Sequence, residues 1–245
     1  MLHATYAAEA AIEETHWWFV GRRRLFAREL MAAGISPGAR IVDVGTGTGS
    51  NLRMLRGLHF AGVEGLDQSE EAIRWCAGKG LGPVRRGSIC DMPFADGTFD
   101  AALATDVIEH VADDTRALAE LARVIRPGGA ALITVPAFRA LWGLQDDVAL
   151  HQRRYRMRPL LGLVRASGLS PVRAYHFNYL LFVPIWGARR VMRLTRSHLE
   201  SEGQVRGPIL DRLLSAVFTL DILTAPRLNP PFGVSILILA IKPAR

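Results

Sequence analysis

Residues 40–50 read RIVDVGTGTGS, and this stretch carries the clearest structural signal in the sequence. The β-branched run at 40–44 is typical of a short buried strand, and a helical pattern follows at 51–56. Glycines between a strand and a helix let the backbone approach a ligand closely, and the helix start favours the polar end of that ligand. The stretch therefore predicts a nucleotide-type site after the first strand of a sheet.

Strand and helix signals alternate along residues 40–135, which predicts a parallel sheet with helices on both faces. Ser69 is expected to cap one helix, and Asp113 or Asp114 another, which the RPGG at 126–129 should stop. The fold class we expect is α/β, a doubly wound, Rossmann-like sheet of seven strands. The expected strands are 40–44, 59–66, 83–87, 98–105, 129–135, 170–179 and 234–242.

Composition limits the class of protein. The chain has 245 residues, of which 49% are hydrophobic and 22% charged, so it is neither disordered nor fibrous. Two cysteines, with no Cys/His cluster, exclude a disulfide scaffold and a zinc module. The N-terminal residues lack a basic segment followed by an apolar run, so we expect no secretory signal and a cytoplasmic location.

The charge is uneven along the chain. Residues 1–130 carry 14 basic and 17 acidic side chains, whereas residues 131–245 carry 16 basic and 6 acidic ones. This asymmetry predicts that the second half meets an anion, which could be a phosphorylated or carboxylated substrate, a membrane surface or nucleic acid. The apolar run 174–188 is too short to span a bilayer, because a spanning helix needs about 20 apolar residues.

The glycine spacing and a preceding acid distinguish two cofactor classes. A dinucleotide site has the pattern GxGxxG, but here the third glycine comes one residue early. Asp43 would repel a pyrophosphate and attract an ammonium or sulfonium group, which favours S-adenosylmethionine over NAD. Asp67 and Asp91 follow the next two strands, where they can accept from ribose hydroxyls and from an adenine amino group. Alternatively, each of these aspartates caps a turn.

The runs VDVGTGTGS, GLDQS, DMPFADGTFDAALATDVIEHV and ELARVIRPGG occur in order between residues 40 and 135. Together they resemble class I S-adenosylmethionine-dependent methyltransferases, most closely the small-molecule branch with ubiquinone-pathway, sugar and antibiotic methyltransferases. The resemblance implies S-adenosylmethionine as cofactor, with the glycines and Asp43 at its methionine end. The cofactor-binding residues implied are Asp43, Gly45, Thr46, Gly47, Gly49, Asp67, Gln68, Asp91, Met92 and Thr105.

The resemblance also divides the chain. We expect an N-terminal helical lid at 1–39, the cofactor-binding core at 40–178, a helical insertion at 179–232 and the last core strand at 233–245. The insertion could close an apolar acceptor pocket, form a dimer interface or core, or lie on an anionic membrane.

The chemistry is expected after the fourth strand, in the run ATDVIEHV. Methyl transfer is an in-line displacement, so the protein aligns the reactants and supplies a base only for a weakly acidic acceptor. His110 is the candidate base, and Asp106 is the second catalytic candidate. His110 could instead pack against the next helix. Asp106, Glu109 and His110 could also hold a divalent cation, although we expect no metal.

Two segments are expected to contact the acceptor. The N-terminal lid offers Trp18, Phe19 and Arg23, and the loop after the fifth strand offers His151, Arg154 and Tyr155. Alternatively, the aromatic residues of the lid anchor its helix to the sheet, and the arginines of both segments are solvated without contacting the acceptor. The NPPF run at 229–232 does not follow the fourth strand, as it does in amino-methyltransferases, and without it we expect no nucleic-acid partner.

The function we expect is methylation of a small or lipid-like acceptor, hydrophobic or anionic, most readily on oxygen. Methylation on nitrogen or carbon is an alternative, as are a nicotinamide dehydrogenase and a non-catalytic scaffold. A homodimer and a peripheral membrane contact also stay open.

Overall fold

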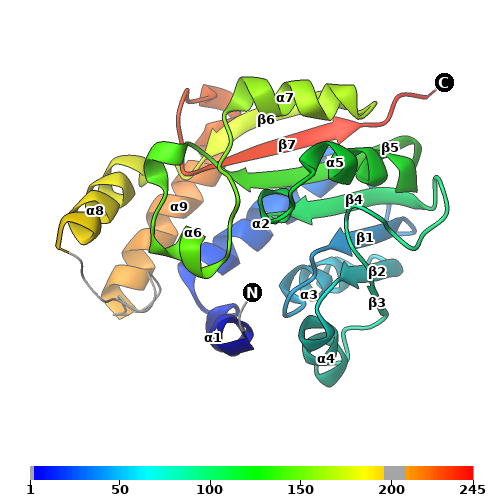
Figure 1. Ribbon diagram of the computed structural model, residues 1–245, viewed down its shortest axis with the longest axis horizontal. Coiled ribbons are helices and arrows are strands. Elements are labelled where there is room, and N and C mark those ends of the chain that lie inside the picture. Colours follow the sequence, from blue (N-terminus) through cyan, green and yellow to red (C-terminus); the bar gives the residue numbers. More distant parts are fainter. Residues whose placement is uncertain (1–2, 196–207, 245) are drawn as a thin grey trace.

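A computed structural model of the chain describes residues 3–195 and 208–244. Its centre is a seven-stranded sheet in the order β3-β2-β1-β4-β5-β7-β6, so the predicted doubly wound α/β fold is confirmed (Figure 1). The strands from β1 to β5 pair in parallel, whereas β7 runs antiparallel to both neighbours. The strands are β1 Arg40–Val44, β2 Gly62–Asp67, β3 Val84–Arg86, β4 Phe99–Thr105, β5 Ile125–Pro136, β6 Ser170–Phe177 and β7 Ser235–Ile241.

Helices cover both faces of the sheet (Figure 1). One apolar core lies under α5 and α7, and the other lies under α2, α3 and α9. The helices are α1 His3–Ile12, α2 Trp17–Ala32, α3 Ser50–Gly57, α4 Glu70–Gly78, α5 Asp114–Val124, α6 Leu144–Val148, α7 Met157–Ala166, α8 Phe182–Thr195 and α9 Pro208–Leu228, with two 3₁₀ turns, η1 Ile108–His110 and η2 Arg139–Leu141.

The local signals act largely as expected. The Ser69 hydroxyl accepts from the Ala72 amide at 3.5 Å, and the Asp113 carboxylate accepts from the Arg116 amide at 2.9 Å, so both predicted caps are present. The RPGG run does not separate α5 from the next strand, because β5 begins at Ile125, directly after the helix. A shift in the pairing of β4 with β5 absorbs these residues, so the strand starts earlier than predicted.

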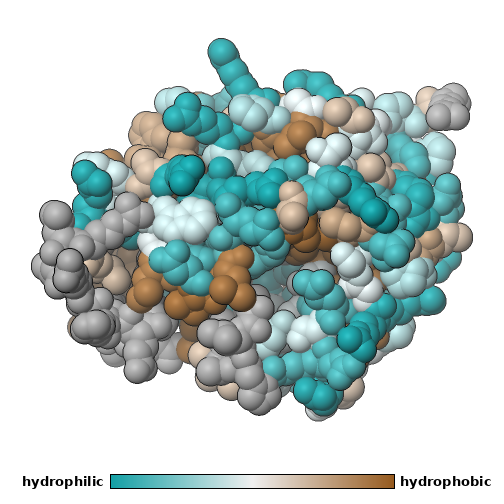
Figure 2. Space-filling view, in the orientation of Figure 1, coloured by the Kyte–Doolittle hydropathy of each residue, from teal (hydrophilic) through white to brown (hydrophobic). Residues whose placement is uncertain are grey.

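The carboxyl ends of the parallel strands point toward the middle of Figure 1, where α1, α6 and the connecting loops gather. The same face is hollowed near its centre in the space-filling view (Figure 2). The helices α8 and α9 lie between β6 and β7 in the chain, within the range 179–232 that the sequence analysis assigns to an insertion. No helix in the described ranges is both long and apolar enough to cross a membrane.

Candidate functional site

The glycine-rich loop follows β1, and its three glycines differ in how closely they are packed. Gly45, Gly47 and Gly49 have φ values of +72°, +55° and +89°, a region that side chains rarely adopt. A Cβ at Gly45 would overlap Val107, and one at Gly49 would lie 2.7 Å from a Leu81 methyl. A Cβ at Gly47 would meet nothing within 4 Å. The loop therefore packs at both ends and is open at Gly47, where a ligand can approach.

Asp43 lies at the end of β1 with no exposed surface. Its Oδ1 accepts a 3.0 Å hydrogen bond from Asn51, whereas its Oδ2 is buried without a partner. Burial raises the pKa of Asp43 to about 7. An acceptor without a donor fits the ammonium group of a methionine moiety. Asn51 also donates to the Thr105 hydroxyl at 3.0 Å, so this amide, which the sequence analysis missed, links β1 to β4.

Asp67, at the end of β2, ties two loops together. Its Oδ2 accepts from the Gly47 amide and its Oδ1 from the Ser69 amide, both at 2.9 Å. Each oxygen keeps a further lone pair for a ribose hydroxyl. Gln68, beside it, is exposed. Thr46 points inward instead, because its hydroxyl donates to the Asp43 carbonyl at 2.9 Å.

The turn after β3 carries the residues predicted for the adenine. Asp91 is exposed, and its amide donates to the Ser88 carbonyl at 3.0 Å, which closes the turn. Ile89 and Met92 are both buried in the core below it. The Asp91 carboxylate is therefore free of these turn contacts, while Met92 offers an apolar edge from within the core.

The N-terminal segment is fastened to the glycine-rich loop by Glu13, which is 2% exposed. Its carboxylate accepts from the Thr48 hydroxyl and, at 2.5 Å, from Lys79 Nζ. Arg23 donates to the Glu13 carbonyl at 2.6 Å and to the Ser50 hydroxyl at 2.8 Å. Arg23 thus braces the cofactor loop, which argues against the acceptor contact predicted for it. The sequence analysis did not single out Glu13.

The two aromatic residues predicted for the lid pack differently, and only Trp18 packs against the core. Trp18 stacks on Phe177 and packs against Phe218, so its ring is an anchor of α2 rather than an open acceptor contact. Phe19 is partly buried and lies edge-on to His16. The side chain of this segment that reaches the end of β4 is Arg22, which was not predicted.

Arg22 pairs with Asp106, the catalytic candidate directly after β4. Arg22 Nη2 lies 2.7 Å from Asp106 Oδ2, and Thr134 donates to Asp106 Oδ1 at 3.1 Å. Asp106 has a φ of +55°, so the backbone turns sharply there and η1 follows. Asp106 is thus engaged by Arg22 of α2, and it is not one of the metal-ligating side chains that the described residues bring together here.

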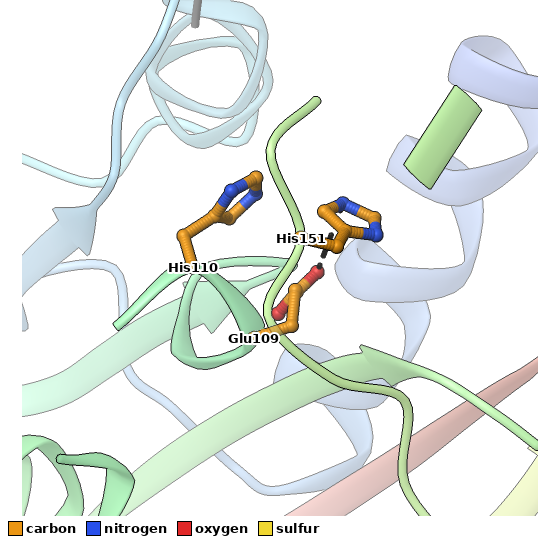
Figure 3. Close-up of side chains that lie close together, drawn as sticks. All are labelled: Glu109, His110 and His151. Carbon is orange, nitrogen blue, oxygen red and sulfur yellow. Dashed lines mark ion pairs between the residues drawn. The ribbon is translucent and has the colours of Figure 1, made fainter. Parts of the chain in front are cut away.

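Glu109, His110 and His151 come together instead (Figure 3). Their donor atoms all lie within 4.8 Å of one another, and the two imidazoles meet edge-on with centroids 4.7 Å apart. Both oxygens of Glu109 are buried without a hydrogen-bond partner, and burial, followed by Asp106, raises its pKa well above the ordinary value. Burial and the neighbouring His151 lower the pKa of His110 to about 4. These three residues can share a proton or hold a cation.

His151 is oriented from behind by Asp146, another residue that the sequence analysis missed. The His151 Nδ1 lies 2.8 Å from Asp146 Oδ1, and Arg154 grips the same carboxylate at 2.7 and 2.9 Å. Burial opposes ionisation of Asp146, but these hydrogen bonds hold its pKa well below the ordinary value. With Nδ1 facing Asp146, Nε2 faces Glu109 at 3.9 Å.

In the loop after β5, two residues that were predicted to contact the acceptor make internal contacts instead. The Arg154 side chain is 4% exposed and serves Asp146, so it braces His151. Tyr155 is buried and donates to Asp114 at 2.9 Å, which argues against a direct acceptor contact. An open pocket of about 460 Å³ lies against this loop. Its lining is basic and aromatic, with Arg139, Trp142, Gln152, Arg153 and Arg154.

Gln152 connects this pocket to the catalytic candidates. Its amide nitrogen donates to the His110 carbonyl at 2.8 Å, and its backbone amide donates to the Glu109 carbonyl at 2.8 Å. The pocket and the histidine pair therefore border the same turn, η1. This is the side of the site on which the sequence analysis expects the acceptor.

Comparison with known proteins agrees with this geometry. A protein-family model described as "Methyltransferase domain" matches residues 42–133. The O-methyltransferase resE of Aspergillus sclerotiorum is 30% identical over 219 residues, which cover 86% of this chain and 81% of that protein. The O-methyltransferase cnsE of Penicillium expansum is 32% identical over 141 residues, or 54% of this chain and half of that protein's length.

Solved structures support the same fold. Phosphoethanolamine N-methyltransferase 2 of Haemonchus contortus, in complex with S-adenosyl-L-methionine, superposes with a TM-score of 0.58 at 16% identity. The superposition covers 90% of this chain and 52% of that one. With the resE match over most of both chains, these findings show that the protein belongs to the class I S-adenosylmethionine-dependent methyltransferases, with S-adenosylmethionine as its cofactor.

Proposed function

We propose that the protein transfers the methyl group of S-adenosylmethionine to an oxygen atom of a small or lipid-like acceptor. The observation that supports this most is the pair formed by His110, which follows β4, and His151, which follows β5, with their rings 4.7 Å apart and His151 oriented by the buried Asp146. An oxygen acceptor must lose a proton as it attacks, and a neutral imidazole can take that proton. The names of resE and cnsE, both O-methyltransferases, point the same way.

The cofactor supplies an electrophilic methyl group when it is bound. Asp43 would hold the ammonium of the methionine part, Asp67 the ribose hydroxyls and Asp91 the adenine amino group. The glycine-rich loop lets the backbone come close at Gly47. The task of these residues is to fix the methyl group in line with the attacking atom, since alignment is the larger part of catalysis in such a displacement.

The base is one member of the histidine pair. Burial keeps His110 neutral at pH 7, because its pKa is lowered to about 4. A low pKa also weakens His110 as a base, since the best catalytic pKa lies near the working pH. His151 complements it, because the contact of Nδ1 with Asp146 leaves Nε2 to accept a proton on the side of Glu109. We assign proton removal to this pair of histidines. The ion pair between Asp106 and Arg22 lies next to it.

Trideuteromethyl S-adenosylmethionine tests the proposal. Lipid and aqueous fractions of a bacterial extract are incubated with the protein and analysed by mass spectrometry, with the Asp43→Asn variant as a matched control. We expect a labelled methyl ether or ester that the control does not form. A label on nitrogen or carbon would contradict oxygen methylation. No labelled product in any fraction, despite tight cofactor binding, would favour the scaffold.

A further inference from the structure

The insertion presents an apolar surface to solvent. Of the 14 large hydrophobic side chains that are exposed among the described residues, 11 lie between residues 180 and 232. In Figure 2, brown side chains gather on the part of this face where α6 and α9 lie. A protein surface that gathers so many exposed apolar side chains in one region marks a contact with another phase or partner.

The exposed side chains follow one face of α9. Ile209, Leu213, Leu220 and Leu223 are between 49% and 82% exposed, and Ala216 completes the stripe at helical spacing. The opposite face is already occupied, because Phe218 packs on Trp17 and Trp18 of α2. The side chains of the outer stripe therefore do not pack in the core of this chain. The helix is thus amphipathic in an unusual way, because its outer face is apolar and no described residue covers it.

The neighbouring helix α8 repeats the arrangement at the same end of the molecule (Figure 1). Val183, Trp186 and Val191 are 66%, 42% and 58% exposed, and the Arg190 guanidinium lies over the Trp186 ring at 5.9 Å. Tryptophan and arginine are the side chains that settle at the boundary between lipid headgroups and acyl chains.

Charge identifies the occupant of this surface. Among the described residues of α8 and α9, the exposed charges are Arg190, Arg212 and Arg227. Of the two carboxylates there, Asp211 is partly buried, and Asp221 is buried, where it accepts from the Asn178 and Leu180 amides. Two copies of this face would bring these arginines together, and the described residues of the two helices offer no exposed carboxylate to pair them. An anionic lipid surface complements both the apolar and the basic side chains.

We propose that the exposed faces of α8 and α9 dock on an anionic membrane surface, with their apolar side chains at the headgroup boundary. The inner side of α8 contacts the loop after β5, since Arg189 donates to the Leu141 carbonyl and Phe182 packs edge-on to Phe138, with ring centroids 5.9 Å apart. Docking thus brings the acceptor side of the site next to lipid. The docking does not depend on which atom is methylated.

Vesicle flotation tests the proposal with the full chain. We expect binding to vesicles of equal parts phosphatidylcholine and phosphatidylglycerol, weakened by salt, and little binding to phosphatidylcholine alone. Leu213→Ser with Leu220→Ser should lower the partition coefficient at least about tenfold, because two apolar side chains no longer leave water. Arg190→Gln and Arg212→Gln should each lower it roughly fivefold.

Met31→Ser with Val172→Ser is the matched control, because these two side chains are 67% and 56% exposed but lie outside the insertion. It should bind as the parent chain does, and circular dichroism melting checks that both double variants are folded. Absence of binding to anionic vesicles would overturn the proposal. So would equal loss in the control, or a parent dimer that Leu213→Ser with Leu220→Ser converts to monomer without any vesicle binding.

Discussion

Arg22 Nη2 lies 2.7 Å from Asp106 Oδ2, so an ion pair joins α2 to the turn after β4. The guanidinium also lies over the rings of Trp18 and Phe26, at 5.5 and 5.1 Å from their centroids. The pair is only slightly exposed, with side-chain exposures of 14% and 26%. It holds the lid against the strand edge at which methyl transfer is expected.

A double-mutant cycle measures this pair. We expect Arg22→Met and Asp106→Asn to show a coupling free energy of about 1–2 kcal/mol in urea unfolding, because each single variant leaves a partly buried charge unpaired. Additive effects of the two substitutions would mean that the lid is held by its aromatic packing alone.

The Asp67→Ala variant should bind S-adenosylmethionine more weakly by about 1.5–3 kcal/mol, the cost of charge-assisted hydrogen bonds to the ribose. Isothermal titration gives the dissociation constant directly. Asp67 also holds the Gly47 amide, so Asp67→Asn, which keeps one acceptor oxygen, separates loop support from ribose binding. An unchanged dissociation constant in both variants would remove Asp67 from the site.

Cofactor affinity should depend on pH through Asp43. Its pKa is raised to about 7, so below that pH the buried carboxyl is protonated and must lose its proton to pair with an ammonium. Affinity therefore rises as the pH approaches 7, by up to roughly tenfold per pH unit, and levels off above. Titrations in buffers of different ionisation enthalpy should show proton release near pH 7. The Asp43→Asn variant should show neither effect.

His110→Ala should lower turnover by roughly 10²–10⁴ and leave cofactor affinity unchanged, if His110 takes the proton. His151→Ala provides the comparison within the pair. A loss confined to His151→Ala would move the role of base to His151. Full activity in both variants would show that the acceptor needs no base from this pair.

His110 should also make the free energy of unfolding depend on pH. Its pKa is lowered from 6.5 to about 4, so the unfolded chain binds the proton more readily than the folded one between these values. The free energy of unfolding should therefore rise with pH from about 4 to 6.5 and show no further change from this group above that range. Urea unfolding across this window should be flatter for a His110→Phe variant than for the parent chain.

Turnover should survive removal of divalent cations. Burial raises the pKa of Glu109 well above its ordinary value, which disfavours the ionised carboxylate that a divalent cation needs. Activity measured before and after dialysis against EDTA checks this. A loss that a single added cation restores would assign the set Glu109, His110 and His151 to metal binding.

The strands, the caps and the glycine-rich loop could be read from the sequence because each depends on neighbouring residues. Ser69 caps the helix that starts next to it, and the β-branched run at 40–44 forms a strand wherever it is buried. The roles of the charged residues in the site could not be read in this way. From the sequence, Arg154 resembles an arginine that binds an anionic ligand. In the structure its guanidinium donates instead to both carboxylate oxygens of Asp146, eight residues away.

The missed residues share a physical reason. Asn51, Arg22 and Glu13 act on partners that are 54, 84 and 35 residues away, respectively, in Thr105, Asp106 and Thr48. No local pattern distinguishes them from surface polar residues of the same segments. The outward stripe of α9 was visible as periodicity, but the sequence could not say whether that stripe faces the core or solvent, because a helix with two apolar faces gives the same signal.

The Glu13 fastening bears on the kinetic order of the reaction. This carboxylate joins the N-terminal segment to Thr48 and Lys79, next to the glycine-rich loop. If cofactor exchange requires the segment to move off that loop, these bonds must break before the spent cofactor can leave. Steady-state kinetics should then follow an ordered sequence, with the cofactor on first and S-adenosylhomocysteine off last, and Glu13→Gln should relax that order by speeding product release.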